Sequence, residues 1–100
     1  MQDEQYLIDR ELGAATLACL DPSWDEAELV IDLTSGGPKI SLTPVGRDGF
    51  AVPSDAVYVA VGKLINLHKD EATDLQRAVY TFQKRPDGKW RFAADFVYPP

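Results

Sequence analysis

The clearest alternation of hydrophobic and polar positions lies in the last quarter of the chain, from residue 75 to residue 98. Two runs rich in aromatic and β-branched residues flank the sequence Pro86-Asp87-Gly88. Pro86 presets φ for the first corner of a turn, Asp87 can bond its own backbone, and Gly88 supplies the positive φ that the turn requires. The pattern predicts a β-hairpin. On its second strand, every second position forms one aromatic-rich face: Trp90, Phe92, Ala94, Phe96 and Tyr98.

A second alternating segment covers residues 27–33, where apolar residues at odd positions face away from Glu28, Val30 and Asp32. This pattern is typical of a half-buried strand. Residues 34–38 predict a turn and residues 39–45 a returning strand. The Gly-containing segment that follows leaves residues 50–52 either as a short third strand or as an ordered loop.

Two segments have helical periodicity. In residues 3–20 the apolar positions recur every three or four residues, and Asp21-Pro22 ends the helix. Gly13 weakens this helix but permits close approach to a sheet. Residues 54–69 predict a second helix with Ser54 as its N-cap. A strand over residues 56–61 competes because of its valines, but sixteen residues without a turn signal favour the helix.

The order is therefore helix, two strands, helix, two strands. It predicts a single α+β domain over residues 1–100, with an antiparallel sheet of four to five strands and two helices on one face. One hundred residues suffice for a core without disulfides, and Cys19 is the only cysteine. No apolar run approaches the roughly 20 residues that cross a bilayer. The N-terminus lacks the features of a signal peptide, so a cytoplasmic protein without membrane contact is expected.

The charge is unevenly distributed. The formal net charge is -6. Up to residue 38 there are nine acidic residues against Arg10 alone, whereas the remainder holds seven acidic and nine basic residues. This distribution opposes binding to nucleic acid and favours a basic partner, although it also serves solubility alone. The bases near the last turn fit a charged hairpin tip better than a nucleic-acid site.

Candidate catalytic and metal-ligating residues are few. His68 has no second histidine and no cysteine near it in sequence, and no metal-ligand spacing is recognisable. Cys19 lies on the apolar face of a predicted helix, where a small buried hydrophobe is expected rather than a nucleophile. The sequence thus predicts neither an enzyme nor a cofactor.

The densest acidic group lies around the first strand, and it is the predicted partner-binding site together with an adjacent aromatic residue: Trp24, Asp25, Glu26, Glu28 and Asp32. A solvated strand face is the competing explanation for the acids. Of the two tryptophans, Trp24 is expected to be exposed and Trp90 to lie in the core, because Trp90 is in register with Phe92 and Phe96.

The run Asp87-Gly88-Lys89-Trp90-Arg91-Phe92, followed by Asp95-Phe96-Val97-Tyr98, resembles the ending of small bacterial immunity proteins of polymorphic-toxin and contact-dependent growth inhibition systems. The YezG-like group, also called the DUF600 family, is the group it is similar to, and Trp24 resembles a tryptophan common there. The resemblance covers about a quarter of the chain and does not extend to residues 44–53. It implies a cytoplasmic antitoxin that binds and blocks a toxin, often a nuclease.

The leading hypothesis is therefore an immunity protein that neutralises a cognate, basic toxin by charge-complementary occlusion. The alternative is a small-ligand-binding or enzymatic α+β domain, with a pocket between helix and sheet lined by Tyr58, Tyr80 and Asp95. A homo-oligomer, such as a homodimer paired through a sheet edge, is a third hypothesis.

Overall fold

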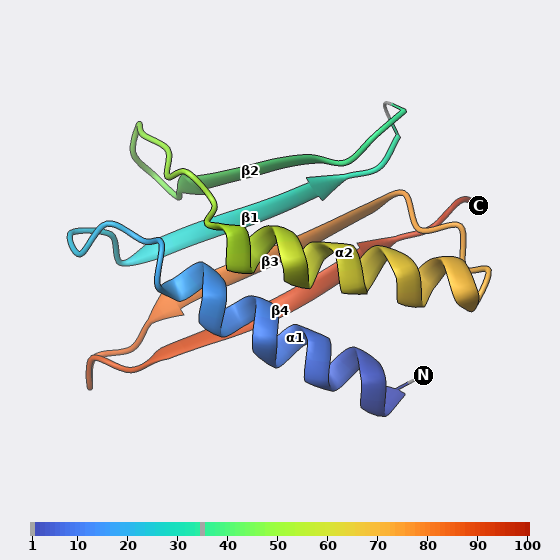
Figure 1. The fold of residues 1–100 in the computed structure, drawn as a ribbon. Helices are drawn as coiled ribbons and strands as arrows, with labels where there is room; N and C mark the ends of the chain where they lie inside the picture. The colour runs from blue at the N-terminus through green and yellow to red at the C-terminus, as the bar shows by residue number, and fades with distance from the viewer. Residues whose placement is uncertain (1, 35) are drawn as a thin grey trace.

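The computed structural model describes residues 2–34 and 36–100. Two helices, both on one side, cover a four-stranded antiparallel sheet (Figure 1). This confirms the expected α+β class and the order of elements. In chain order these are α1 (Gln2–Leu17), β1 (Glu26–Asp32), β2 (Lys39–Pro44), α2 (Asp55–Asp70), β3 (Arg77–Lys84) and β4 (Trp90–Val97).

The sheet has the strand order β2-β1-β3-β4. Each hairpin, β1–β2 and β3–β4, pairs locally, and the two hairpins meet where β1 pairs with β3. Leu29 lies opposite Leu42 on one side and opposite Tyr80 on the other. Because directly paired residues share a face, this register gathers the apolar positions of the three strands beneath the helices.

The last turn forms as its residues predict. Gly88 has φ +84° and its N–H donates to the carbonyl of Arg85, while the N–H of Lys89 donates to Asp87 Oδ1 at 3.0 Å. Alternation also holds in β3, where Ala78, Tyr80 and Phe82 face the helices and their neighbours face away. In β4 the predicted aromatic face is only partly buried, and Phe92 is exposed. Local turn chemistry therefore suffices to set this hairpin.

The second helix begins where its cap predicts. Ser54 Oγ accepts a hydrogen bond from the N–H of Val57, and the segment is helical rather than extended. The first helix ends at Leu17, earlier than predicted, because residues 18–20 form a turn closed by shorter-range bonds such as Cys19 N–H to the carbonyl of Thr16. Gly13 lies against the sheet: a Cβ built there would be 2.9 Å from Phe92 Cε1. The close approach expected at this glycine is confirmed.

The segment between β2 and α2 is a loop rather than a third strand. Its one β-type contact is the bond from the N–H of Ala51 to the carbonyl of Leu42, at 2.8 Å. Phe50 and Val52 on either side are exposed. In the predicted turn at residues 34–38, Gly36 has φ +84°, and Ser35 lies outside the described residues.

Candidate functional site

The sheet face opposite the helices carries most of the predicted site. Along β1 the side chains of Glu26, Glu28, Val30 and Asp32 point to this open face, and each is only half-buried. Their partners across the strands are largely small or polar. The strand order places β1 between β2 and β3, so these carboxylates lie near the middle of the sheet rather than on an edge.

At one end of this row, Glu26 is connected to a cation through an amide. Arg91 donates to Gln83 Oε1 from Nε at 3.2 Å and from Nη2 at 2.9 Å. Gln83 Nε2 in turn donates to Glu26 Oε1 at 3.4 Å. Three neighbouring strands thus contribute one chain of hydrogen bonds that orients the Glu26 carboxylate.

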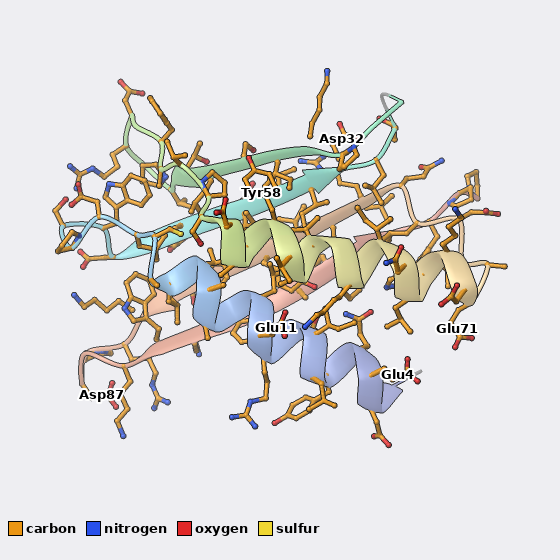
Figure 2. The ribbon with its side chains drawn as sticks, in the orientation of Figure 1. Glu4, Glu11, Asp32, Tyr58, Glu71 and Asp87 are labelled. Carbon is orange, nitrogen blue, oxygen red and sulfur yellow. The ribbon has the colours of Figure 1, made fainter. Side chains whose placement is uncertain are left out.

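At the other end, Asp32 lies opposite Lys39 on β2 and Arg77 on β3 (Figure 2). Its Oδ1 accepts from Thr34 Oγ1 at 2.6 Å and from the Thr34 N–H at 2.9 Å. These hydrogen bonds, helped by the two nearby cations, hold the pKa of the Asp32 carboxyl below its usual range.

Between these ends, Glu28 lies opposite Thr43 and Thr81, without a cation across either strand. Asp25 is exposed just before β1, and its carbonyl accepts from the N–H of Lys84. Asp25 and Glu26 line one shallow hollow together with Lys84, Arg85 and Arg91. The acidic group is thus brought together in space, but basic residues of the last hairpin lie beside it.

Trp24 is not exposed, and the expectation that it would be was wrong. Its exposed fraction is 5 %, and it belongs to the core. The ring lies near Gly49, whose built Cβ would be 3.6 Å from Trp24 Cζ2, so the loop after β2 folds against it. Trp90, which was expected in the core, packs against the core but remains partly exposed. Lys84 Nζ lies 6.0 Å from the centre of the Trp90 ring.

The three residues expected to line a ligand pocket do not come together. Tyr58 lies on the exposed side of α2 with 52 % of its surface free (Figure 2). Asp95 lies opposite Val79 on the open face of the sheet, whereas Tyr80 is fully buried beneath the helices. These positions do not form the pocket of the alternative hypothesis.

A partly buried polar network joins the two helices to the sheet. Asp9 Oδ1 accepts from the Tyr80 hydroxyl at 2.6 Å and from Gln5 Nε2 at 2.7 Å. Gln5 Oε1 lies 2.7 Å from His68 Nε2, and His68 Nδ1 lies 2.8 Å from Thr73 Oγ1. The direction of each bond follows from the one before it. The Gln5 amide nitrogen donates to the Asp9 carboxylate, so Gln5 Oε1 faces His68 and can only accept; His68 Nε2 must therefore carry a proton.

The pKa values of both titratable rings in this network are shifted toward the neutral form. Burial lowers the pKa of His68 below its ordinary value, although the charge of Asp9 acts in the opposite direction. Burial and the bond to Asp9 raise the pKa of the Tyr80 phenol. Thr73 Oγ1 lies within hydrogen-bond distance of His68 Nδ1 and also donates to the His68 carbonyl at 3.4 Å. The imidazole also lies within 5.5 Å of the Phe96 ring and 6.0 Å of the Tyr98 ring, measured between centroids.

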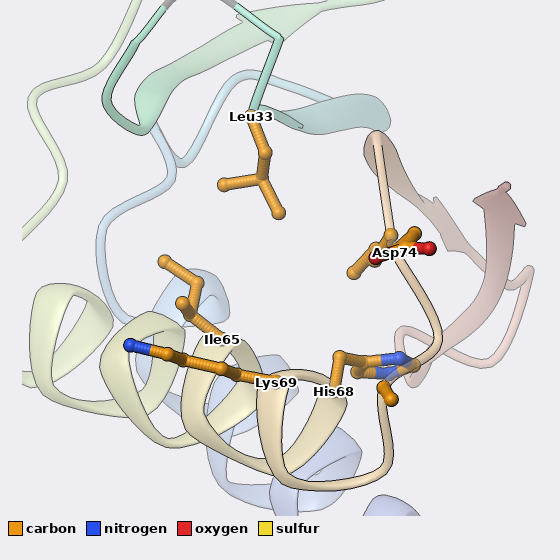
Figure 3. Close-up of a pocket in the computed structure, with 7 residues that line it drawn as sticks. Leu33, Ile65, His68, Lys69 and Asp74 are labelled. Atoms are coloured by element: carbon orange, nitrogen blue, oxygen red, sulfur yellow. The ribbon is translucent and has the colours of Figure 1, made fainter. Parts of the chain in front are cut away.

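His68 borders a shallow hollow at the end of α2 (Figure 3). The hollow is lined by Leu33, Ile65, His68, Lys69, Ala72, Asp74 and Leu75. Ala72 and Asp74 in its rim have positive φ values of 52° and 55°, a conformation that costs free energy for residues with a Cβ. Thr73, which contacts the imidazole, lies between these two residues.

Sequence reasoning missed Gln5 and Asp9. The signal that could have found them is their spacing, because polar residues four apart lie on the same helix face as Ile8 and Leu12. Among the described residues, no group of three or more His, Cys, Asp and Glu side chains could hold a metal ion. None of the helices in the described part is long and apolar enough to cross a membrane.

Comparisons of the chain with protein-family models and with curated proteins find no match.

Proposed function

We propose that this chain is a binding protein of the immunity type, which docks on a basic toxin through the open face of its sheet and blocks the toxin's active site or substrate groove. The observation that supports this function best is the row formed by Glu26, Glu28 and Asp32 on a face that neither helix covers. β1 is hydrogen-bonded to strands on both sides. A partner therefore meets carboxylates carried by an ordered backbone, which reduces the entropy lost on binding.

The surroundings of Glu28 indicate what this partner must offer. Thr43 and Thr81 flank it directly, and Val30 follows it along the strand. These side chains are short, so another protein surface can approach closely. Glu28 has no cation opposite it and needs one from the partner. A lysine or arginine on an otherwise flat surface fits this requirement, and such charge pairs fix orientation and specificity.

In this proposal Asp25 extends the anionic row at its exposed end, and Trp24 acts indirectly. Being buried beside the loop after β2, Trp24 fixes the backbone from which Asp25 projects. Affinity beyond the charge contacts must come from the partner's own side chains and from the short side chains at the centre of the open face.

The first experiment is affinity capture with three tagged forms of the chain: the native sequence, an Asp25→Asn/Glu28→Gln variant, and an Asp70→Asn/Glu71→Gln control. Both variants lose two negative charges, but the control changes exposed positions at the end of α2. We expect the native chain and the control to retain one stoichiometric basic polypeptide that the first variant releases at lower salt. Equal release from both variants would contradict docking through the sheet face.

The second experiment tests neutralisation directly. The captured polypeptide is expressed alone in bacteria and then together with each form of the chain. We expect it to arrest growth, the native chain and the control to restore growth, and the Asp25→Asn/Glu28→Gln variant to restore it poorly. A captured polypeptide that is harmless by itself would refute the immunity function while leaving the docking face supported.

A further inference from the structure

The two edges of the sheet differ in how many backbone groups they leave free. On β2 the N–H of Val45 bonds the carbonyl of Glu26, and hydrogen bonding alternates along an antiparallel ladder. The backbone N–H and carbonyl groups that point away from β1 therefore belong to Ile40, Leu42 and Pro44. The carbonyl of Leu42 already accepts from Ala51, and Pro44 has no N–H to donate. This edge is therefore largely blocked against another strand.

β4 is the outermost strand on the other side of the sheet (Figure 1). β4 runs from Trp90 to Val97, pairs with β3 over all eight positions, and contains neither proline nor glycine. At its last position the carbonyl of Val97 accepts from the N–H of Gln76. No described segment bridges its outer side. A long regular edge strand of this kind is a template for pairing with a further strand.

Hydrogen bonds elsewhere in the sheet identify the free groups. The N–H of Lys84 bonds Asp25, and the carbonyl of Gln76 accepts from Leu33, so the even-numbered residues of β3 bond β1. Its odd-numbered residues consequently bond β4, as the bond from the N–H of Arg85 to Lys89 also indicates. The outward backbone groups of β4 therefore belong to Trp90, Phe92, Ala94 and Phe96.

We propose that two copies of this chain pair through β4, antiparallel about a two-fold axis that sets Ala93 opposite Ala93 of the second copy. In this register Trp90 faces Phe96 of the second copy and Phe92 faces its Ala94, so all four outward positions find hydrogen-bond partners. Registers shifted by two residues in either direction leave one of these positions unmatched. The pairing joins two four-stranded sheets into one and leaves β1 accessible.

Charge favours a second copy as the occupant. On the open face the same register sets Arg91 opposite Asp95 of the second copy, and the symmetry repeats this pair. Asp95 is exposed on β4, and the one salt bridge within the described residues joins Lys63 to Glu11. Arg91 uses Nε and Nη2 on Gln83, so Nη1 remains for a second carboxylate.

The aromatic face adds apolar area. Phe92 is 38 % exposed. Gly13 of α1 lies against its ring, and the rings of Tyr80 and Phe82 on β3 lie 6.3 and 5.7 Å from it between centroids, on the side away from the sheet edge. The two copies of Phe92 lie diagonally across the paired Ala93 residues, on the helix side of the joined sheet. Their contact removes apolar surface from water.

Sedimentation equilibrium over a concentration series tests the pairing through charge reversal. Arg91→Asp and Asp95→Arg each set like charges opposite one another at both symmetric contacts. We expect each to raise the dissociation constant of the dimer about tenfold, and the double exchange Arg91→Asp/Asp95→Arg to restore it. A native chain that stays monomeric up to its solubility limit, or a double exchange no better than the single variants, would overturn the proposal.

A cysteine variant tests the register. In a Cys19→Ser background, Ala93→Cys sets two thiols opposite each other in a non-hydrogen-bonded pair, where Cα atoms are about 4.5 Å apart and a disulfide can form. Thr81→Cys, on the same face but inside the sheet, is the matched control. We expect mild oxidation to link the first variant and not the second. Equal linkage of both variants, or linkage of neither, would overturn this register.

Discussion

The hydrogen bond between Tyr80 and Asp9 gives the sharpest test of the partly buried network. Tyr80 is fully buried, and its hydroxyl donates to Asp9 Oδ1 at 2.6 Å. Tyr80→Phe removes the donor and keeps the ring. A hydrogen bond to a charged group contributes about 1.5–3 kcal/mol, so we expect a loss of about 2 kcal/mol in the free energy of unfolding. For a domain of this size, that lowers Tm by about 10 °C.

Urea denaturation followed by circular dichroism measures this loss, and the m value should stay unchanged because the surface exposed on unfolding is the same. Tyr58→Phe is the matched control, since Tyr58 is exposed and the substitution removes the same atom. We expect it to change stability by less than about 0.5 kcal/mol.

A double-mutant cycle separates the bond from other effects of the substitution. Asp9→Ala alone leaves the Tyr80 hydroxyl and the Gln5 amide without their acceptor, and it should cost about 3 kcal/mol. The loss in the Asp9→Ala/Tyr80→Phe double variant should be smaller than the sum of the two single losses by about 1–2 kcal/mol. Strict additivity, or a Tyr80→Phe variant as stable as the native chain, would refute the role assigned to this bond.

Three further predictions concern other buried residues. Because the pKa of His68 is lower in the folded than in the unfolded state, the unfolded chain binds the proton first. Stability should therefore be complete above about pH 6.5 and fall as the pH drops below it, a slope that His68→Gln should reduce in urea titrations at several pH values. Trp24→Ala should cost about 3–5 kcal/mol in the same assay, and a loss below about 1 kcal/mol would contradict its place in the core. Thr16→Val should raise Tm by several degrees, because the buried Thr16 hydroxyl has no hydrogen-bond partner among the described residues.

The parts of the fold that local chemistry decides were predictable from the sequence. The last hairpin follows from Pro86-Asp87-Gly88 and the flanking alternation, and α2 follows from its cap at Ser54. The burial of Trp24 was not predictable, because it depends on the loop near Gly49, which lies beyond two intervening strands. Gln5 and His68 likewise meet only after α1 and α2 pack together.

The electrostatics of the site escaped prediction for a related reason. Along the chain, the acidic first third and the more basic remainder are separate. Pairing of β1 with β3 places Arg77 opposite Asp32 and Gln83, with its bound Arg91, opposite Glu26. The carboxylates could be located from the sequence, but the cations beside them could not. The sequence does not reveal that the second hairpin pairs with β1 rather than with β2.

The strand order also determines when the protein can fold during synthesis. β1 is made early, yet one of its neighbours is β3, so residues 26 and 83 pair across most of the chain. Until the last hairpin leaves the ribosome, β1 lacks a partner on one side and the helices lack Tyr80 and Phe82 to cover. The nascent chain therefore holds an apolar half-sheet open until residues 77–97 have been made. Such an intermediate is exposed to aggregation and to chaperone binding.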